Sequence, residues 1–127
     1  MHYFTKATPE FGRGLYASYD MRAQMMLFTD ELLVLSPEDT KKIDQTDLRY
    51  YVYKYNDEKD CLALGHGTLF NHSDNPNIGY KIMEYGDREV IAFYTLRPIE
   101  AYEQLFIDYN ADCKVDMAKY MSRKSVT

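Results

Sequence analysis

The sequence predicts a single domain of mostly β structure, and three observations lead to this prediction. The chain has 127 residues, 46% of them hydrophobic, which is enough for one modest core. Its apolar segments are short and rich in Tyr, Val, Ile and Phe, which is typical of strands, and thirteen residues are tyrosines. No internal repeat, low-complexity tract or Gly/Ser/Pro-rich linker divides it. We therefore treat residues 1–127 as one domain.

Five short strands are expected in the first half of the chain, where apolar runs are bounded by turn residues. They cover residues 2–7, 15–18, 24–29, 32–35 and 48–55. The last of these alternates along its length, which would place Tyr51, Tyr53 and Tyr55 on one face of a strand.

One short helix is expected between the fourth and fifth strands. Ser36 is a suitable N-cap, Pro37 suits the first helical position, and Asp39 stands three residues after the cap. We expect this helix to end near Ile43.

The second half of the chain predicts a hairpin, a last strand and a final helix. Residues 78–85 and 89–96 flank Gly86-Asp87, a turn sequence that joins antiparallel strands. A short strand is expected at residues 105–109. The spacing of apolar residues over 111–123 indicates a C-terminal helix.

The net charge limits the classes of partner. The chain carries 15 basic and 20 acidic side chains, which leaves a net charge of −5. Binding to nucleic acid through phosphate neutralisation needs a basic face, so we expect no direct nucleic-acid binding. The acidity suits a basic partner such as a lysine-rich peptide, although many soluble proteins are equally acidic.

Targeting signals and cysteine usage indicate an intracellular protein. No apolar stretch approaches the roughly 20 residues that span a bilayer, so no membrane association is expected. The N-terminus lacks the basic-then-apolar layout of a secretory signal. Cys61 and Cys113 are then expected to be free thiols in a reducing compartment. We expect a soluble protein of the cytoplasm or of a host nucleus, and not a secreted one.

Three stretches differ from ordinary strand sequence. Residues 11–16 (FGRGLY) contain two glycines spaced by one residue, which allow close backbone approach but are more often a plain turn. Residues 69–77 (LFNHSDNPN) form a polar, turn-rich cluster that follows an apolar run. Residues 97–109 (RPIEAYEQLFIDY) end in an Asp-Tyr pair.

In this order and spacing, the three stretches resemble the motifs of the SET-domain protein lysine methyltransferases. The family carries GxG, then a motif close to FxNHSCxPN, then RxIxxGEELxxDY some 30 to 40 residues later. The resemblance covers about residues 3–110, which leaves 111–127 as a C-terminal cap segment. The small size is similar to that of minimal viral and bacterial members without added zinc modules. The resemblance implies a β-clip of small sheets, in which the last motif passes through a loop to lie against the central one.

The resemblance also implies roles for individual residues. S-adenosylmethionine, which becomes S-adenosylhomocysteine, would bind on one face, and a lysine of a protein substrate would enter a narrow channel from the other. Tyr109 would be the catalytic tyrosine. The implied cofactor-binding residues are Gly12, Arg13, Gly14, Tyr51, Asn71 and His72. The implied channel residues are Tyr53, Tyr80, Tyr94 and Ile107.

Elementary chemistry is consistent with those roles. Methyl transfer needs a neutral amine in line with the sulfonium methyl, so the site supplies mainly geometry and a matched electrostatic surface. Free lysine has a pKa of about 10.4, and a tight tyrosine-lined channel would lower it by desolvation. Each channel tyrosine could equally be a half-buried strand residue. At Tyr80 a side chain that narrows the channel would favour monomethylation, whereas Ile107 replaces an aromatic residue of other members and has the opposite effect.

Three positions depart from the family pattern. Tyr102 replaces a glycine, Gln104 replaces an acid, and Asp74 replaces a cysteine that helps many members to bind zinc. Because only Cys113 follows Asp74, the zinc cluster cannot be built, and we predict no metal site. The missing wall would then come from residues 111–127 or from a second subunit in a homodimer.

Two functions follow from these features. The first is S-adenosylmethionine-dependent methylation of a lysine side chain in a protein, which could be a histone. The alternative is a catalytically weak or inactive SET module that binds the cofactor or a basic peptide, and the three departures motivate it. The sequence does not identify the substrate, because specificity in this family resides in variable surface loops.

Overall fold

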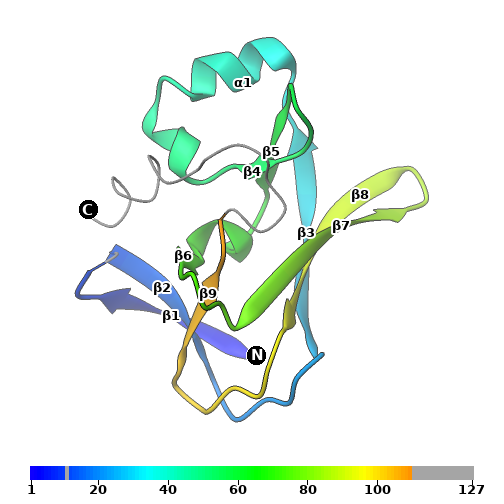
Figure 1. Ribbon diagram of the computed structural model, residues 1–127. Helices are drawn as coiled ribbons and strands as arrows, with labels where there is room; N and C mark the ends of the chain where they lie inside the picture. The colour runs from blue at the N-terminus through cyan, green and yellow to red at the C-terminus, as the bar shows by residue number, and fades with distance from the viewer. Residues whose placement is uncertain (11, 110–127) are drawn as a thin grey trace.

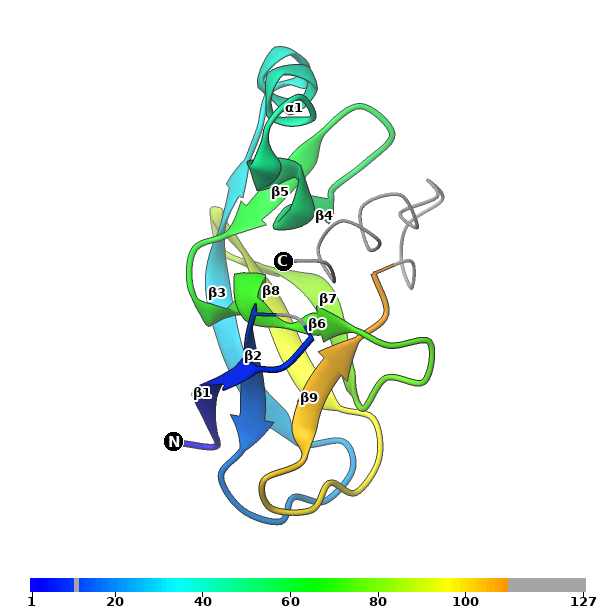
Figure 2. The same ribbon diagram turned by 90° about the vertical axis from the view of Figure 1, so that its left-hand side faces the viewer.

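The computed structural model describes residues 1–10 and 12–109, and it confirms the mostly β prediction (Figures 1 and 2). The elements in chain order are β1 (Tyr3–Thr8), β2 (Gly12–Ala17), β3 (Met26–Val34), α1 (Pro37–Ile43), η1 (Asp47–Tyr50), β4 (Tyr53–Lys54), β5 (Asp60–Ala63), η2 (His66–Leu69), β6 (Asn71–His72), β7 (Ile78–Tyr85), β8 (Arg88–Thr95) and β9 (Gln104–Ile107), where η denotes a 3-10 helix. Within the described residues no helix is long and apolar enough to cross a bilayer. The C-terminal helix expected at 111–123 lies outside the described residues.

The strands form two sheets. One has the order β4-β5-β3-β8-β7, and all of its neighbours are antiparallel. The other has the order β1-β2-β9-β6, so that the last strand lies between the N-terminal hairpin and the short strand β6. In Figure 1, β9 lies beside β2 in the lower half, and β7 and β8 run out to the right. The pairing of β9 with β6 is parallel, which requires a long connection between the two strands.

A cluster of aromatic rings joins the two sheets in the core. Phe93 on β8 is fully buried, and its ring centroid lies 4.8 Å from that of Phe70 and 4.9 Å from that of Phe28. Phe70 comes immediately before β6, so this cluster packs β3 and β8 against the start of the second sheet. Burial of rings of this size is the main source of stability in such a core.

The predicted helix and hairpin are confirmed. The hydroxyl of Ser36 accepts a hydrogen bond from the Asp39 N–H at 3.0 Å, Pro37 opens α1, and the helix ends at Ile43. Figures 1 and 2 both show α1 at one end of the molecule. The hairpin turns at Gly86-Asp87 between β7 and β8, where Gly86 adopts φ +61°.

The prediction of two strands at 24–29 and 32–35 is wrong, because one strand, β3, runs through both. The polar pair Asp30-Glu31 separates the two predicted segments, but both side chains have partners elsewhere in the fold. Asp30 accepts a hydrogen bond from the Gly67 N–H at 2.8 Å, and Glu31 pairs with Arg88 at 2.7 Å. The first part of β3 pairs with β8 and the last part with β5.

The strand expected at 48–55 is also largely wrong. Thr46 caps the 3-10 helix η1 by accepting from the Leu48 N–H, and only Tyr53–Lys54 extend a sheet. Two strands were not predicted: β5, and the two-residue strand β6 inside the polar motif. Neither has a pattern long enough to be seen without its partner strand.

Candidate active site

The central and last sequence motifs lie against each other, as predicted. In the parallel pairing of β6 with β9, Asn71 is opposite Phe106 and His72 is opposite Ile107. Asn77 reinforces the pairing, since its Oδ1 accepts from the Phe106 N–H at 2.8 Å and its Nδ2 donates to the Gln104 carbonyl at 2.9 Å. Buried amides that are satisfied in this way hold one segment in a single register against another.

One side of this junction is a cluster of amide groups around Asn71. The Asn71 Nδ2 donates to the Arg13 carbonyl at 3.2 Å and to the Gln104 Oε1 at 3.0 Å. The Arg13 carbonyl can only accept, so it determines which amide atom of Asn71 is the nitrogen. A Cβ on Gly14 would lie 2.7 Å from the Gln104 Oε1, so a larger residue there would require the Gln104 side chain to shift away from Asn71.

The Asn71 side chain is fully buried, and its Oδ1 has no hydrogen-bond partner among the described residues. A buried acceptor without a donor is costly, by about 1–3 kcal/mol. Such an atom is suited to a ligand that brings a donor. Gly12, Arg13 and His72 of the predicted cofactor site lie in the same region, on β2 and β6.

The other side of the junction is a tyrosine-rich pocket. Of the predicted site residues, it brings together Tyr51, Tyr53, Tyr80, Ile107 and Tyr109. Its remaining lining residues are Tyr50, Val52, Lys54, Gly67, Thr68 and Phe70. Four separate segments of the chain therefore contribute walls, and sequence patterns alone do not place them together.

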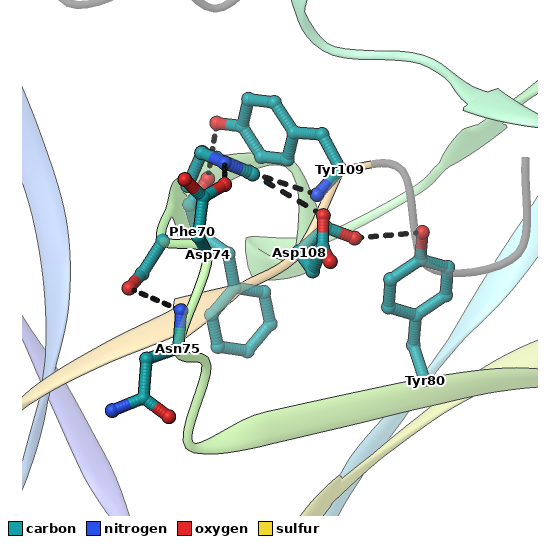
Figure 3. A network of polar contacts seen from close by, with 8 residues as sticks. Phe70, Asp74, Asn75, Tyr80, Asp108 and Tyr109 are labelled. Atoms are coloured by element: carbon teal, nitrogen blue, oxygen red, sulfur yellow. Dashed lines mark hydrogen bonds and ion pairs between the residues drawn. The ribbon is translucent and has the colours of Figure 1, made fainter. Parts of the chain in front are cut away.

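Tyr109 is held at the inner wall of this pocket. Its hydroxyl donates to the Phe70 carbonyl at 2.8 Å, as Figure 3 shows. Burial, and next the nearby hydroxyls of Tyr51 and Tyr80, raise the pKa of Tyr109 far above its ordinary value. The phenol therefore stays protonated, and it can accept a hydrogen bond while donating its own proton to Phe70.

Two further residues, Asp30 and Gly67, support the pocket wall, and they were not identified from the sequence. The Tyr53 hydroxyl donates to the Gly67 carbonyl at 2.6 Å, while the Asp30 carboxylate accepts from the Gly67 N–H at 2.8 Å. A Cβ on Gly67 would lie 2.6 Å from both Asp30 and Phe93. The close-set pair Gly65 and Gly67 is the signal in the sequence for such a close approach.

Tyr94 is the one predicted channel residue that does not line the pocket. Its neighbour Phe93 packs against Tyr53 and Tyr80 on the pocket side of β8. Successive strand residues point to opposite faces, so Tyr94 lies on the other face, over Gly79 and within 5.7 Å of the Lys81 ammonium. The register of β8 therefore separates Tyr94 from the tyrosines that it resembles in sequence.

The ring of His72 is engaged within the chain at both nitrogens. Its Nδ1 accepts from the Tyr109 N–H at 3.0 Å, and its Nε2 lies 2.8 Å from the Asp74 carboxylate. Because both ring nitrogens are engaged within the chain, only the ring face and the main chain of His72 are left to contact the predicted cofactor.

The fold accommodates each of the three departures from the family pattern. Tyr102 adopts φ +69°, the left-handed conformation that glycine favours, and its N–H bonds to the Ala17 carbonyl at 2.8 Å. Gln104 supplies an oxygen to Asn71, as a carboxylate would, and Asp74 pairs with His72. The departures therefore do not disrupt the site.

We predict that the purified protein contains no structural zinc. Within residues 1–10 and 12–109 no group of three metal-ligating side chains is present, and Cys113 lies outside the described residues. Cys61 is buried. Elemental analysis by mass spectrometry is the measurement, and a stoichiometric zinc content of one per chain would contradict the prediction.

The protein is a mostly β domain in which the central motif, on β6, pairs with the last motif, on β9. The buried Asn71 lies on one side of this pair, and the tyrosine pocket lies on the other. A family model described as the SET domain matches residues 12–110. The chain belongs to the SET-domain family of protein-lysine methyltransferases.

Two curated relatives have similar sequences. A histone-lysine N-methyltransferase of Schizosaccharomyces pombe, specific for H3 lysine 37, is 36% identical over 103 residues. The match covers 80% of this chain and 69% of that protein. The histone-lysine N-methyltransferase trithorax of Drosophila virilis is 30% identical over 105 residues, which cover 77% of this chain but 3% of that protein.

Two solved structures share the fold. A candidate histone methyltransferase of Plasmodium falciparum superposes with a TM-score of 0.73 and 20% identity, and covers 88% of this chain and 96% of its own. CpSET8 from Cryptosporidium gives a TM-score of 0.70 and 23% identity, over 89% of this chain and 59% of its own. At these identities the likeness concerns the fold.

Proposed function

We propose that this protein transfers a methyl group from S-adenosylmethionine to the side-chain amine of a lysine in a protein substrate. The observation that carries the proposal is the position of Tyr109, whose buried hydroxyl is anchored on Phe70 at a pocket walled by tyrosines. The family membership of the chain supports the same activity.

The amide cluster suits the amino-acid end of S-adenosylmethionine. Its ammonium would supply the donor that the buried Asn71 Oδ1 lacks among the described residues. Gly12 and Gly14 would let the main chain approach closely, and Gly12 has the positive φ of +78° that only glycine adopts readily. When bound, the cofactor supplies an electrophilic methyl group on a sulfonium.

The tyrosine pocket suits the lysine end of the reaction. Aromatic walls favour an alkyl chain and a methylammonium product, and desolvation there favours the neutral amine over the ammonium. The Tyr109 oxygen can accept an N–H of that amine, since its own proton is donated to Phe70. Tyr109 therefore orients the amine, and its raised pKa argues against a role as a base.

The proposed methyl transfer conserves atoms and electrons without any further reactant. The lone pair of the neutral lysine nitrogen forms the new N–CH₃ bond, the S–CH₃ bond breaks, and its electron pair stays on sulfur. The products are S-adenosylhomocysteine and a protonated N-methyl lysine, whose extra proton leaves to solvent. The chain contributes alignment and partial charges to this displacement.

The substrate that we propose is a lysine-rich protein, with histones as the first class to test. Both curated relatives are described as histone-lysine methyltransferases, and the net charge of −5 suits a basic substrate. A histone substrate would place the protein where chromatin is present.

The deciding experiment is methyl transfer from labelled S-adenosylmethionine to core histones and to a mixture of basic proteins. We expect label in lysine of at least one acceptor, and none when acceptor lysines are blocked by acetylation. Calorimetry on Asn71→Ala is the matched cofactor test, in which we expect weaker binding because Oδ1 is removed. A wild-type protein that labels no acceptor would overturn the proposal.

The alternative function, a binding module without turnover, rests on Tyr102, Gln104 and Asp74. Because the fold accommodates all three, no observation in the structure favours it over the enzyme. Calorimetry distinguishes the two, since cofactor binding with no acceptor found on a broad peptide array would favour the module.

If Tyr80 narrows the pocket, monomethyl-lysine should be the main product, whereas Ile107, where other members have an aromatic residue, acts in the opposite direction. The Tyr80 ring centroid lies 5.0 Å from that of Tyr53, and the Tyr80 hydroxyl donates to the Asp108 carbonyl at 3.3 Å. Tyr80→Phe removes that hydroxyl and should allow dimethyl or trimethyl product. Mass spectrometry of the modified peptide is the measurement, and trimethyl product from the wild type would contradict the expectation.

A further inference from the structure

We propose that His72 is a positioning residue for the reaction, because its ring holds the peptide unit that carries Tyr109. The proposal rests on the methyltransferase function proposed above. It goes beyond that function by assigning the imidazole ring a task in catalysis that does not involve the cofactor.

The peptide unit between Asp108 and Tyr109 is held at both ends. Its carbonyl, on Asp108, accepts from the Tyr80 hydroxyl at 3.3 Å, and its N–H, on Tyr109, donates to the His72 Nδ1 at 3.0 Å. The C=O and N–H of a trans peptide point in opposite directions, and the described residues contain no cis peptide. Tyr80 and His72 therefore hold this peptide plane by hydrogen bonds at opposite edges, an arrangement that we call the grip.

Figure 3 shows the same arrangement in space. Tyr80 approaches Asp108 from β7, on the side away from Asp74, and the Tyr109 ring extends to Phe70. With its main chain held at one end and its hydroxyl held on Phe70 at 2.8 Å, Tyr109 has little freedom to move its oxygen. A displacement of about 1 Å in a reacting group can cost on the order of 10²-fold in rate.

The hydrogen bonds of the His72 ring determine its working form. Because Nδ1 accepts the Tyr109 N–H, the neutral ring carries its proton on Nε2, and this proton points to the Asp74 Oδ1 at 2.8 Å. Asp74 itself is almost fully exposed, so its contribution is orientation of the ring more than energy.

Protonation of the ring would break this grip. The groups that face it are the carboxylates of Asp74, at 2.8 Å from Nε2, and Asp108, at 3.8 Å from Nδ1, together with the Tyr109 ring at 5.1 Å between centroids. In the doubly protonated ring Nδ1 is a donor, so it faces the Tyr109 N–H as a second donor. The contact that supports Tyr109 therefore needs the neutral form of the His72 ring, in which Nδ1 is an acceptor.

The test compares His72→Asn with His72→Ala. The asparagine Oδ1 stands at the same number of bonds from Cα as Nδ1, so it can accept the Tyr109 N–H but cannot titrate. Alanine offers no acceptor. We expect kcat to fall on the order of 10²-fold in His72→Ala and to be largely retained in His72→Asn. His66→Asn is the matched control, because the His66 ring bonds to the Tyr3 hydroxyl and does not line the pocket.

The pH profile adds a readout that a merely structural role would not move. Deprotonation of the substrate lysine makes log(kcat/KM) rise with a slope of one in every variant. We expect an additional acid limb in the wild type and in His66→Asn, and its absence in His72→Asn. An acid limb that persists unchanged in His72→Asn would overturn the proposal.

A spectroscopic arm separates this proposal from the proposed function. In protein labelled with ¹⁵N-tyrosine, the Tyr109 amide signal is assigned by its absence in Tyr109→Phe. We expect it to shift as the His72 ring titrates, and to stay constant in His72→Asn. A Tyr109 amide that ignores the ring titration refutes the grip. If the wild type transfers no methyl group, the proposed enzymatic function is refuted. The amide signal would still show whether the His72 ring holds the Tyr109 N–H.

Discussion

Tyr109→Phe is expected to fold and to bind S-adenosylmethionine, but to transfer methyl groups on the order of 10²-fold more slowly than the wild type or worse. The substitution removes only the hydroxyl that donates to Phe70 at 2.8 Å and that would accept an N–H of the substrate amine. The aromatic wall remains, so the substrate can still enter. What is lost is the orientation of the amine toward the methyl group.

Single-turnover kinetics and cofactor calorimetry measure this prediction separately. The rate of the chemical step should fall, whereas the dissociation constant of the cofactor should change little. The unfolding free energy should fall by about 1 kcal/mol, since one buried hydrogen bond is removed. Tyr85→Phe is the matched control, because Tyr85 is 50% exposed in the β7–β8 hairpin and does not line the pocket. Equal rates for Tyr109→Phe and the wild type would contradict the assigned role.

The largest effect on stability is expected from Phe93→Ala. Phe93 is fully buried, and its ring packs against Phe28, Phe70, Tyr53 and Tyr80. Truncation of a core phenylalanine costs about 3–5 kcal/mol, which is a large part of the 5–15 kcal/mol that holds a typical domain together. Because both contacted tyrosines, Tyr53 and Tyr80, line the pocket, the truncation should also weaken the binding of cofactor and substrate.

Urea denaturation followed by tyrosine fluorescence measures this loss, and Phe4→Ala is the control. Phe4 is 36% exposed at the edge strand β1, so its truncation should cost less than about 1 kcal/mol. If the two variants lost equal stability, Phe93 would not be at the centre of the core.

Local chemistry explains the parts of the fold that were predicted correctly. The α1 cap depends on Ser36 and Asp39, three residues apart, and the hairpin turn depends on Gly86 and its positive φ. In both cases the residues that decide the structure are neighbours in the chain. The motif residues were also recognisable, because asparagine, histidine and tyrosine occur there in a distinctive order.

The features that the sequence did not reveal depend on distant partners. Strand β3 continues through Asp30 because Gly67, 37 residues away, satisfies its carboxylate. Strand β6 exists only because β9 pairs with it in parallel, and Tyr94 is excluded from the pocket by the register of β8. Both nitrogens of His72 have partners, and one of them, Tyr109, is 37 residues away.

The sequence by itself determined the family and the mostly β class, and it singled out the candidate site residues, since each of these depends on residue type and short spacing. Only the tertiary structure decided which tyrosines share a pocket, what the Asn71 and His72 side chains bond to, and how the Tyr109 peptide is held. These contacts join segments about 30 to 60 residues apart. Their free energy exists only once the chain has closed the intervening loops, so no local pattern encodes them.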